Sequence, residues 1–239
     1  MKLVAPMAGI TDSNFLIKLI PFGFNAVSLG GYNLDEATLN AATNVLSRGR
    51  KEFIIPLDNI YSHISSEVFK LKNFNNNMTV FANLRSSNPE DIVKISKIPD
   101  LDVVEINCHC RQEEFLAIGC GQEMLLRDDL LDFISYVVDN ASSKVSVKIR
   151  ANVSGVDTLN ISKKIASTGI NYLHIDAMKP GFNDFDFDLL NEIVKNVDVN
   201  IIGNNSINNS NQVSKILKTG VNGFSIGRAV INGSLDFEI

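Results

Sequence analysis

The sequence lacks the long apolar run that a membrane-spanning helix needs. No segment of its 239 residues approaches about 20 consecutive apolar residues, and the mean hydropathy is only +0.08. The N-terminal segment turns polar after Gly9, too early for the apolar region of a signal peptide. Gly/Ser-rich and Pro-rich linkers are also absent. These absences predict one cytoplasmic domain over residues 1–239 with no membrane partner.

The chain also lacks an excess of positive charge. It carries 22 Lys and Arg against 27 Asp and Glu, a formal net charge of −5. Proteins that bind nucleic acids tightly usually carry a basic excess, because neutralised phosphates supply much of the affinity. The strongest local cluster is Arg48, Arg50 and Lys51, which we interpret as a solvated surface. The composition therefore argues mildly against tight RNA binding and leaves a local basic patch open.

Cysteine is scarce. The three residues are Cys108, Cys110 and Cys120, with His109 between the first two. This spacing matches no common zinc site, so we expect no metal. A structural disulfide is not expected in a reducing cytoplasm. A thiol at the end of a strand can instead act as an acid or a nucleophile, whereas Cys120 is expected to be buried and inert.

What the sequence does contain is an alternation of short apolar runs with amphipathic segments. The runs are mostly continuously apolar, which is typical of parallel strands covered on both faces. They are Leu3–Ala8, Asn25–Leu29, Glu52–Leu57, Thr79–Leu84, Val103–Asn107, Val145–Ile149, Tyr172–Ile175, Asn200–Gly203 and Gly223–Ile226.

Helical patterns lie between most of these runs, and several have a capping residue before them or a glycine or proline after them. The predicted helices are Ser13–Ile20 (after Asp12 and before Pro21 and Gly23), Pro89–Lys97 (after Asn88), Asp128–Val138, Asp157–Ser167, Asp188–Val197 and Asn211–Leu217. Strands that alternate with helices predict a parallel sheet, and about eight such units in this length predict a single (β/α)8 TIM barrel. A doubly wound open sheet is the alternative.

Polar residues gather where the predicted strands end. They are Pro6 with Met7, Asn83, Asn107 with Cys108 and Cys110, Lys148 with Arg150, His174 with Asp176, Asn204 with Asn205, and Gly227 with Arg228. The carboxyl ends of barrel strands meet at one mouth, so we expect these residues to converge there.

Three of these strand ends together indicate a phosphorylated ligand. Lys148 can hold an anionic ring, polarise a carbonyl or form a Schiff base. The segments Gly203–Ser206 and Ile226–Arg228 fit the phosphate site that the loops after strands seven and eight form in such barrels. His174 is expected to donate to a phosphate or a ring carbonyl, whereas His63 and His109 are not assignable from position.

These motifs resemble those of the tRNA-dihydrouridine synthase family, flavin-binding barrels related to dihydroorotate dehydrogenase. The family opens with Ala-Pro-Met-Ala-Gly-x-Thr-Asp, which residues Ala5–Asp12 match. Its Asp-x-Asn-x-Gly-Cys-Pro segment resembles Glu105–Arg111, and its Gly-x-x-Leu-Leu-Arg stretch resembles Gly121–Arg127. Further matches are Val145–Arg150, His174, Ile202–Asn204 and Ile226–Ala229, so the resemblance covers nearly the whole chain.

The resemblance implies FMN in the barrel mouth. Pro6 and Met7 would lie against the isoalloxazine, Asn83 and Lys148 would contact the ring, and His174, Gly203, Asn204, Gly227 and Arg228 would lie near the ribityl phosphate. Reduced flavin would pass a hydride to C6 of a uracil ring while Cys110 protonates C5. Asn107 would orient the base and Arg150 would contact the substrate. NADPH or another hydride donor would reduce the flavin.

The sequence departs from the family pattern at four places. His109-Cys110-Arg111 replaces Gly-Cys-Pro, Asn83 replaces a glutamine, and Asp176 replaces the arginine of His-x-Arg-Thr. The residues end at Ile239, about where the barrel closes, so we expect no counterpart of the family's C-terminal helical domain.

Three functions remain open at this point. The first is reduction of a pyrimidine: the resemblance favours uridine in tRNA as the partner, and the acidic balance favours a smaller uracil-like molecule. The second is a flavin- or phosphate-binding barrel that has lost catalysis. The third is a lyase or aldolase that uses Lys148 as a Schiff base. The oligomeric state is not predicted.

Overall fold

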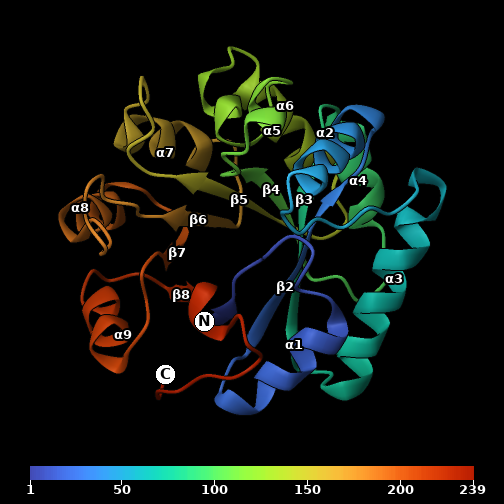
Figure 1. The fold of residues 1–239 in the computed structure, drawn as a ribbon. Coiled ribbons are helices and arrows are strands. Elements are labelled where there is room, and N and C mark those ends of the chain that lie inside the picture. Colours follow the sequence, from blue (N-terminus) through green and yellow to red (C-terminus); the bar gives the residue numbers. More distant parts are fainter.

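Eight parallel strands close into a barrel in the computed structural model, which describes residues 1–239 (Figure 1). Neighbours in the chain pair with one another, and β8 pairs with β1 to complete the ring. The strands are β1 (Lys2–Val4), β2 (Ala26–Asn33), β3 (Thr79–Arg85), β4 (Val103–Cys108), β5 (Lys144–Arg150), β6 (Tyr172–Asp176), β7 (Asn200–Asn204) and β8 (Gly223–Ile226). The predicted (β/α)8 barrel is confirmed. The doubly wound alternative is wrong, because an open sheet has two edge strands, whereas every strand here pairs on both sides.

Helices surround this ring of strands (Figure 1). They are α1 (Ser13–Leu19), α2 (Glu36–Ser47), α3 (Leu57–Phe74), α4 (Pro89–Ser96), α5 (Glu113–Leu116), α6 (Leu130–Asn140), α7 (Thr158–Ala166), α8 (Phe187–Asn196) and α9 (Ser210–Leu217). Three short 3-10 helices, η1 (Ile20–Phe22), η2 (Gly121–Leu126) and η3 (Arg228–Val230), complete the set. None of the helices has both the length and the apolar character that crossing a membrane requires.

Side-chain caps fix where several helices begin. The carboxylate of Asp12 accepts the backbone N–H of Phe15 at the start of α1, and Asn88 caps α4 in the same way. Both caps are as predicted. After α1 the chain tightens into η1, which contains Pro21 and ends at Gly23 with a left-handed φ of 96°.

The segment predicted as a strand at Glu52–Leu57 is not a strand. Residues 51–56 run as an extended connection, and α3 begins at Leu57 immediately after Pro56. Phe53 and Ile55 are apolar because they pack against the barrel core from outside. Every strand edge of the closed barrel is already paired, so a further strand has no partner there.

Helices α2 and α3 were not predicted. A reciprocal capping box opens α2. The Asp35 carboxylate accepts a hydrogen bond from the backbone N–H of Thr38, and the Thr38 hydroxyl accepts one from the backbone N–H of Asp35. The false strand at Glu52–Leu57 hid the start of α3.

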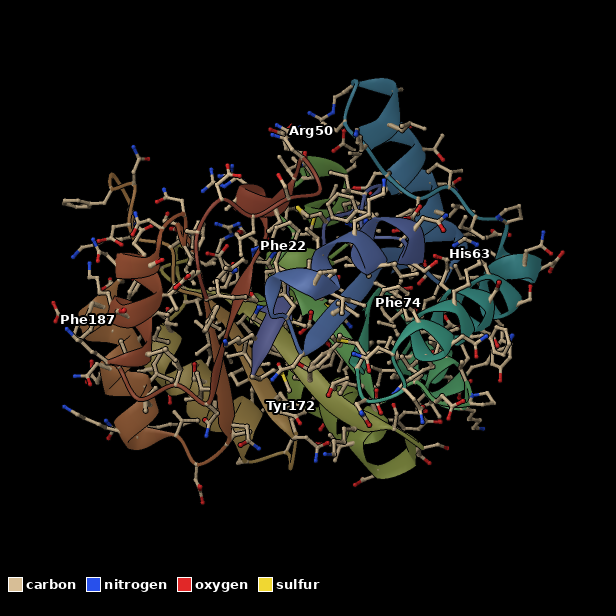
Figure 2. The ribbon with its side chains drawn as sticks, turned by 90° about the horizontal axis from the view of Figure 1, so that it is seen from below. Phe22, Arg50, His63, Phe74, Tyr172 and Phe187 are labelled. Atoms are coloured by element: carbon tan, nitrogen blue, oxygen red, sulfur yellow. The ribbon has the colours of Figure 1, made fainter.

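The barrel interior is layered because side chains two residues apart on a strand point the same way. An apolar layer at the amino end of the strands consists of Leu3, Ala26, Phe81, Val103 and Ile202. The next inward residues along the same and neighbouring strands are polar. Figure 2 shows Tyr172, the first residue of β6, toward one end of the barrel and Arg50 at the other. The polar layers therefore lead up to the mouth at the carboxyl ends.

Candidate functional site

Two adjoining cavities open at the carboxyl ends of the strands. The first has a volume of about 790 Å³ and lies over β5 to β8, and the second, of about 470 Å³, lies over β3 and β4. Pro6, His109, Arg111, Lys148 and Arg150 line both. These shared residues make the two cavities halves of one mouth, as a functional barrel requires.

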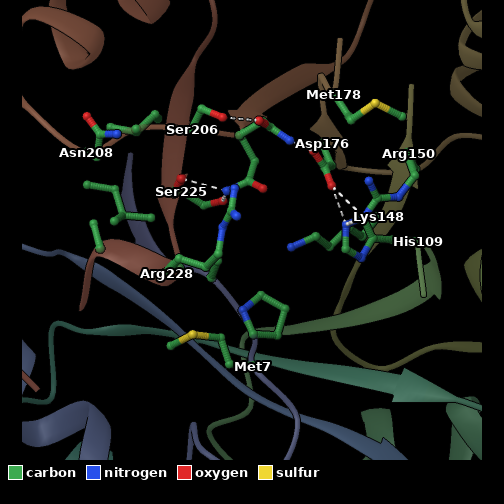
Figure 3. Close-up of a pocket in the computed structure, with 18 of the residues that line it drawn as sticks. Met7, His109, Lys148, Arg150, Asp176, Met178, Ser206, Asn208, Ser225 and Arg228 are labelled. Atoms are coloured by element: carbon green, nitrogen blue, oxygen red, sulfur yellow. Dashed lines mark hydrogen bonds and ion pairs between the residues drawn. The ribbon is translucent and has the colours of Figure 1, made fainter. Parts of the chain in front are cut away.

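Most residues predicted to bind the cofactor meet in the first cavity, which Figure 3 shows. Those that line it are Pro6, Met7, Lys148, Asn204, Gly227 and Arg228. They come from loops and strands that lie far apart in the sequence, and the barrel brings them together.

The loops after β7 and β8 offer free hydrogen-bond donors to the first cavity. Asn205 and Ser206 have left-handed φ values of 117° and 52°. The backbone N–H groups of Asn205, Ser206 and Gly227 donate no hydrogen bond within the chain. The Asn204 side chain joins the carboxyl ends of β7 and β8 by donating to the carbonyl and hydroxyl oxygens of Ser225, each at 2.8 Å. Such unpaired N–H groups can hold a phosphate.

Lys148 lies below these loops and is only 3% exposed. Its ammonium forms no hydrogen bond within the protein, although the carboxylates of Glu105 and Asp176 are near enough to act on it through charge. Burial lowers the pKa of Lys148, and those two carboxylates oppose the lowering. A buried cation without a hydrogen-bond acceptor is costly, so an anionic ligand in the mouth would supply the acceptor that the protein does not.

The second cavity is strongly cationic although the chain as a whole is acidic. Its charged lining residues are Arg50, Lys51, Arg85, Arg111, Lys148 and Arg150, against the single carboxylate of Glu52. Arg48 pairs at the surface with Glu114 at 2.5 Å, as predicted for a solvated charge. Arg50 and Lys51 are exposed, as interpreted from the sequence, and both also line the second cavity.

Cys110 lines the second cavity on a turn that the protein holds from both sides. The Asn107 amide oxygen accepts the backbone N–H groups of His109 at 3.1 Å and Cys110 at 2.9 Å. The carbonyl of Cys110 accepts the N–H of Gln122 at 2.8 Å. Gly121, with a φ of 64°, packs on that carbonyl, and a Cβ there would lie 2.2 Å from the oxygen. The turn is well defined despite its departure from Gly-Cys-Pro.

Asn83 and Asn107 belong to a hydrogen-bonded chain that runs down into the barrel. Asn107 Nδ2 donates to Asn83 Oδ1, and Asn83 Nδ2 donates to Glu105 Oε1, each at 2.8 Å. The oxygen of Asn107 is therefore already used twice by the Cys110 turn. Its predicted role of orienting a base rests on the one remaining N–H of its amide.

His174 does not reach the mouth, contrary to the expected contact with a ligand phosphate. It is fully buried, with Nδ1 2.8 Å from Glu105 Oε2 and Nε2 2.7 Å from Ser225 Oγ. Burial raises the pKa of Glu105. The contacts with His174 and Asn83 and the charge of Lys148 lower this pKa by more than burial raises it. The pKa of Glu105 falls to about 2. Asp176, two residues after His174, takes the position at the mouth because inward residues alternate along β6.

Gly203 is also away from the cavity, contrary to its predicted place at the cofactor. Its inward neighbours on β7 are Ile202 and Asn204, so Gly203 faces outward toward α9. A Cβ there would lie 2.7 Å from Ile216 Cδ1. The glycine thus permits close packing of helix on strand.

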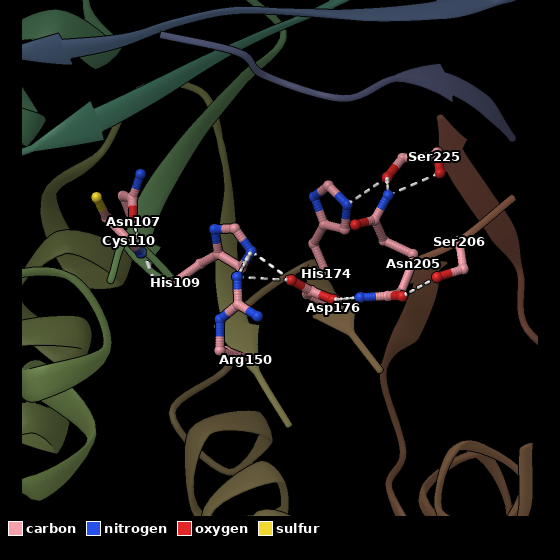
Figure 4. Close-up of polar contacts among 10 residues, drawn as sticks. Asn107, His109, Cys110, Arg150, His174, Asp176, Asn205, Ser206 and Ser225 are labelled. Carbon is pink, nitrogen blue, oxygen red and sulfur yellow. Dashed lines mark hydrogen bonds and ion pairs between the residues drawn. The ribbon is translucent and has the colours of Figure 1, made fainter. Parts of the chain in front are cut away.

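His109 is a site residue to which the sequence assigned no role. Its Nε2 lies 2.6 Å from Asp176 Oδ2, and Arg150 lies 3.1 Å from the same oxygen (Figure 4). Burial raises the pKa of Asp176, but the bond from His109 and the charge of Arg150 outweigh it, and the pKa lies well below its ordinary value. The replacement of Gly by His beside the predicted catalytic cysteine was the only signal in the sequence.

The other two cysteines are enclosed. Cys108 and Cys120 are buried, and burial raises the pKa of the Cys120 thiol to about 11. Cys120 is the buried side chain that the sequence predicted. No group of three or more His, Cys, Asp or Glu residues is arranged to hold a metal ion.

Known proteins resemble this chain at three levels. The family model described as dihydrouridine synthase matches residues 3–233. An uncharacterized protein of Methanocaldococcus jannaschii is 33% identical over 98% of this chain and 91% of its own length. A tRNA-dihydrouridine(20a/20b) synthase NAD(P)+-like protein of Mus musculus is 24% identical over 56% of this chain and 43% of its own. Among solved structures, a mutant tryptophan synthase α-subunit of Pyrococcus furiosus shares the fold, with a TM-score of 0.62, 15% identity and coverage of 97% and 88%.

Proposed function

This chain belongs to the dihydrouridine synthase family, and from that premise we propose that it is an FMN-dependent oxidoreductase that reduces the C5–C6 bond of a uracil ring. The observation that carries the proposal is the meeting of three features at one mouth. These are the free N–H groups after β7 and β8, the unpartnered ammonium of Lys148, and the half-buried thiol of Cys110.

The first cavity fits FMN in its donors and charges. The N–H groups of Asn205, Ser206 and Gly227, with Arg228 beside them, suit a dianionic phosphate. Lys148 would face the electron-rich edge of the ring system, where its charge opposes the cost of added electrons. Pro6 and Met7 supply an apolar wall for a flat ring.

When bound, FMN in its reduced form would supply a hydride to C6 of the uracil. Cys110 would then donate its thiol proton to C5, which leaves a saturated C5–C6 bond and a thiolate. The hydrogen bonds that hold the Cys110 backbone support this role, because a proton donor must be kept at a fixed place. Arg150 would lie beside the substrate at the boundary of the two cavities.

The second cavity and the relatives support a particular substrate class and reductant. Its cationic lining supports a uracil that carries phosphate, either as a nucleotide or within tRNA. This local cationic lining supports anion binding at the site even though the whole chain carries a net charge of −5. The name of the mouse relative includes NAD(P)+, which supports a nicotinamide as the hydride donor to the flavin.

The visible absorption spectrum of the purified protein tests the cofactor, with mass spectrometry of whatever heat releases. We expect a flavin spectrum and released FMN. The photoreduced protein is then mixed with uridine, uridine 5′-monophosphate and unmodified tRNA, and reoxidation is followed under nitrogen. Reoxidation by at least one of them is expected. A protein that binds FMN but is reoxidised by none would be a non-catalytic flavin-binding barrel, and one that takes up no FMN would remove the proposal.

A further inference from the structure

Two departures from the family pattern touch each other across the mouth. His109 replaces the glycine before the cysteine, and Asp176 replaces an arginine at the end of β6. The residues lie 67 positions apart in the chain, yet His109 Nε2 and Asp176 Oδ2 are 2.6 Å apart. Asp176 is itself held by Arg150 at 3.1 Å and by Asn205. The imidazole is thus fixed by a carboxylate that has two further partners.

This contact decides which nitrogen of His109 carries the proton. Asp176 is ionised, because its pKa lies well below its ordinary value, so its oxygen can only accept and Nε2 donates along the 2.6 Å contact. Arg150 Nη2 lies farther from the same nitrogen, at 3.2 Å, and donates to Asp176 instead. Burial lowers the pKa of His109 to about 4 despite the opposing effect of Asp176. The ring is therefore neutral at pH 7, and its Nδ1 is a bare acceptor.

Nδ1 of His109 has no partner in the protein. It forms no hydrogen bond, and it is not among the buried side-chain atoms left without one, so it is open to the cavities. The His109 side chain is 24% exposed and lines both cavities. Figure 4 shows it between Cys110 and Asp176.

The polar side chains around the second cavity otherwise offer donors. Its Arg and Lys residues have no acceptor atoms. The side-chain oxygens that could accept already have donors. Glu52 accepts from Arg85, and Asn83 accepts from Asn107. Asn107 accepts from the Cys110 turn, and Gln112 accepts from Arg48. A uracil ring has two carbonyl oxygens, which suit the cations, and one N–H at position 3, which needs an acceptor. Cytosine presents an unprotonated nitrogen at that position.

We infer that His109, clamped by Asp176, presents Nδ1 as the acceptor for a ring N–H of the substrate, so that the site selects rings with a donor at position 3 over cytosine-type rings. The inference rests on the proposed function for the presence of a pyrimidine beside Cys110. His109 acts in it as a specificity-determining residue, and Asp176 acts as a positioning residue through it.

The tautomer can be measured without any ligand. Long-range 1H–15N NMR of the histidine rings, assigned with a His109→Phe variant, is expected to show His109 neutral and protonated on Nε2 at pH 7. A charged ring, or a proton on Nδ1, would overturn the inference whatever the protein binds.

Binding of uridine and cytidine to the FMN-loaded protein tests the selection directly. The wild type should bind uridine at least about tenfold more tightly than cytidine, since a mismatched ring leaves polar atoms unpaired. His109→Phe keeps a ring of similar size without an acceptor and should bind both alike. His109→Asn places an acceptor near Nδ1 and should keep most of the preference. A purely structural role predicts the reverse order, with Phe tolerated better than Asn.

The outcomes separate the inference from the proposed function. Equal binding of the two nucleosides by the wild type, or a preference that survives in His109→Phe, would overturn the inference and leave uracil reduction standing. Binding of neither nucleoside by protein that has taken up FMN would overturn both. Failure to take up FMN would remove the proposed function, and the NMR result would still decide the acceptor role of Nδ1.

Discussion

Arg85 and Glu52 form a buried ion pair under the second cavity, with 2.8 Å between Nη1 and Oε2 and only 4% of each side chain exposed. The guanidinium also lies 4.1 Å from the ring centre of Phe115 and within 3.2 Å of Asn33 Oδ1. The pair ties the connection before α3 to the end of β3. It thereby fixes the wall of the cavity beside Lys51.

The first prediction concerns the stability of this pair. Glu52→Gln keeps the shape of the side chain but leaves a buried guanidinium without its counter-charge. Removal of one partner of a buried pair typically costs about 3 to 5 kcal/mol, so we expect the free energy of unfolding to fall by about 3 kcal/mol. Urea unfolding followed by circular dichroism measures the change. Glu192→Gln, on the exposed face of α8, is the control and should change stability by less than about 0.5 kcal/mol.

The segment that carries Glu52 is also where fold prediction failed. Strands such as Val103–Cys108 could be predicted because their apolar residues are continuous and their ends carry turn signals. The segment Glu52–Leu57 has the same local pattern, yet its apolar residues pack on the outside of the barrel. A short apolar run does not reveal whether a neighbouring strand has a free edge. Only closure of the ring settles that.

The sequence predicts which residues lie near the carboxyl ends of the strands. It does not predict how deep in the barrel each side chain lies or whether it points inward. Lys148 and Arg228 were placed in the mouth because they follow apolar strands. His174 and Gly203 satisfy the same rule, but one lies a layer deeper and the other points to a helix. The contact of His109 with Asp176 joins distant strands, and no local spacing contains it.

The second prediction is a pH dependence of stability that arises from Glu105. Its pKa is about 2 in the folded protein against an ordinary value of 4.5. Between these values the unfolded chain binds more protons, so stability falls as the pH drops through this window. The loss from this group is up to about 3 kcal/mol. Urea unfolding between pH 7 and pH 3 should show a shallower decline in Glu105→Gln than in the wild type, from a lower starting stability at pH 7.

Glu192→Gln is again the control, since this exposed carboxylate should leave the acid slope unchanged. An identical slope in wild type and Glu105→Gln would show that other carboxylates dominate the acid response.

The third prediction separates ligand binding from stability at Lys148. Lys148→Met keeps the length of the side chain and removes a buried charge that has no hydrogen-bond partner. We expect FMN affinity to fall about 100-fold, because loss of a charged contact costs about 2 to 3 kcal/mol. The apoprotein should not lose stability, since its desolvated charge is gone. Fluorescence titration gives the affinity and thermal unfolding the stability. Lys163→Met, on the exposed side of α7, should change neither.

The fourth prediction compares two cysteines. Cys110→Ala should slow reoxidation of the reduced flavin by uridine or tRNA at least about 100-fold, as expected for loss of a general acid. It should leave the flavin bound, because the thiol lines only the second cavity. Cys120→Ala is the matched control: this buried thiol belongs to the apolar cluster against which Cys110 packs, but it lines neither cavity, so turnover should be retained. Normal turnover by Cys110→Ala would assign the proton to another group.

The fifth prediction addresses the charge of the second cavity. Arg111 is an exposed cation that lines both cavities, beside the turn that presents Cys110. Arg111→Glu should weaken binding of uridine 5′-monophosphate or unmodified tRNA about tenfold or more at low salt. Binding of uridine, which has no phosphate, should stay within about twofold. For tRNA, the slope of log affinity against log salt should become smaller by about one if this residue meets one phosphate. Lys164→Glu makes the same charge change on α7, away from the lining of both cavities, and should have little effect. An equal loss for uridine and its monophosphate would mean that Arg111 positions the Cys110 turn and does not recognise an anion.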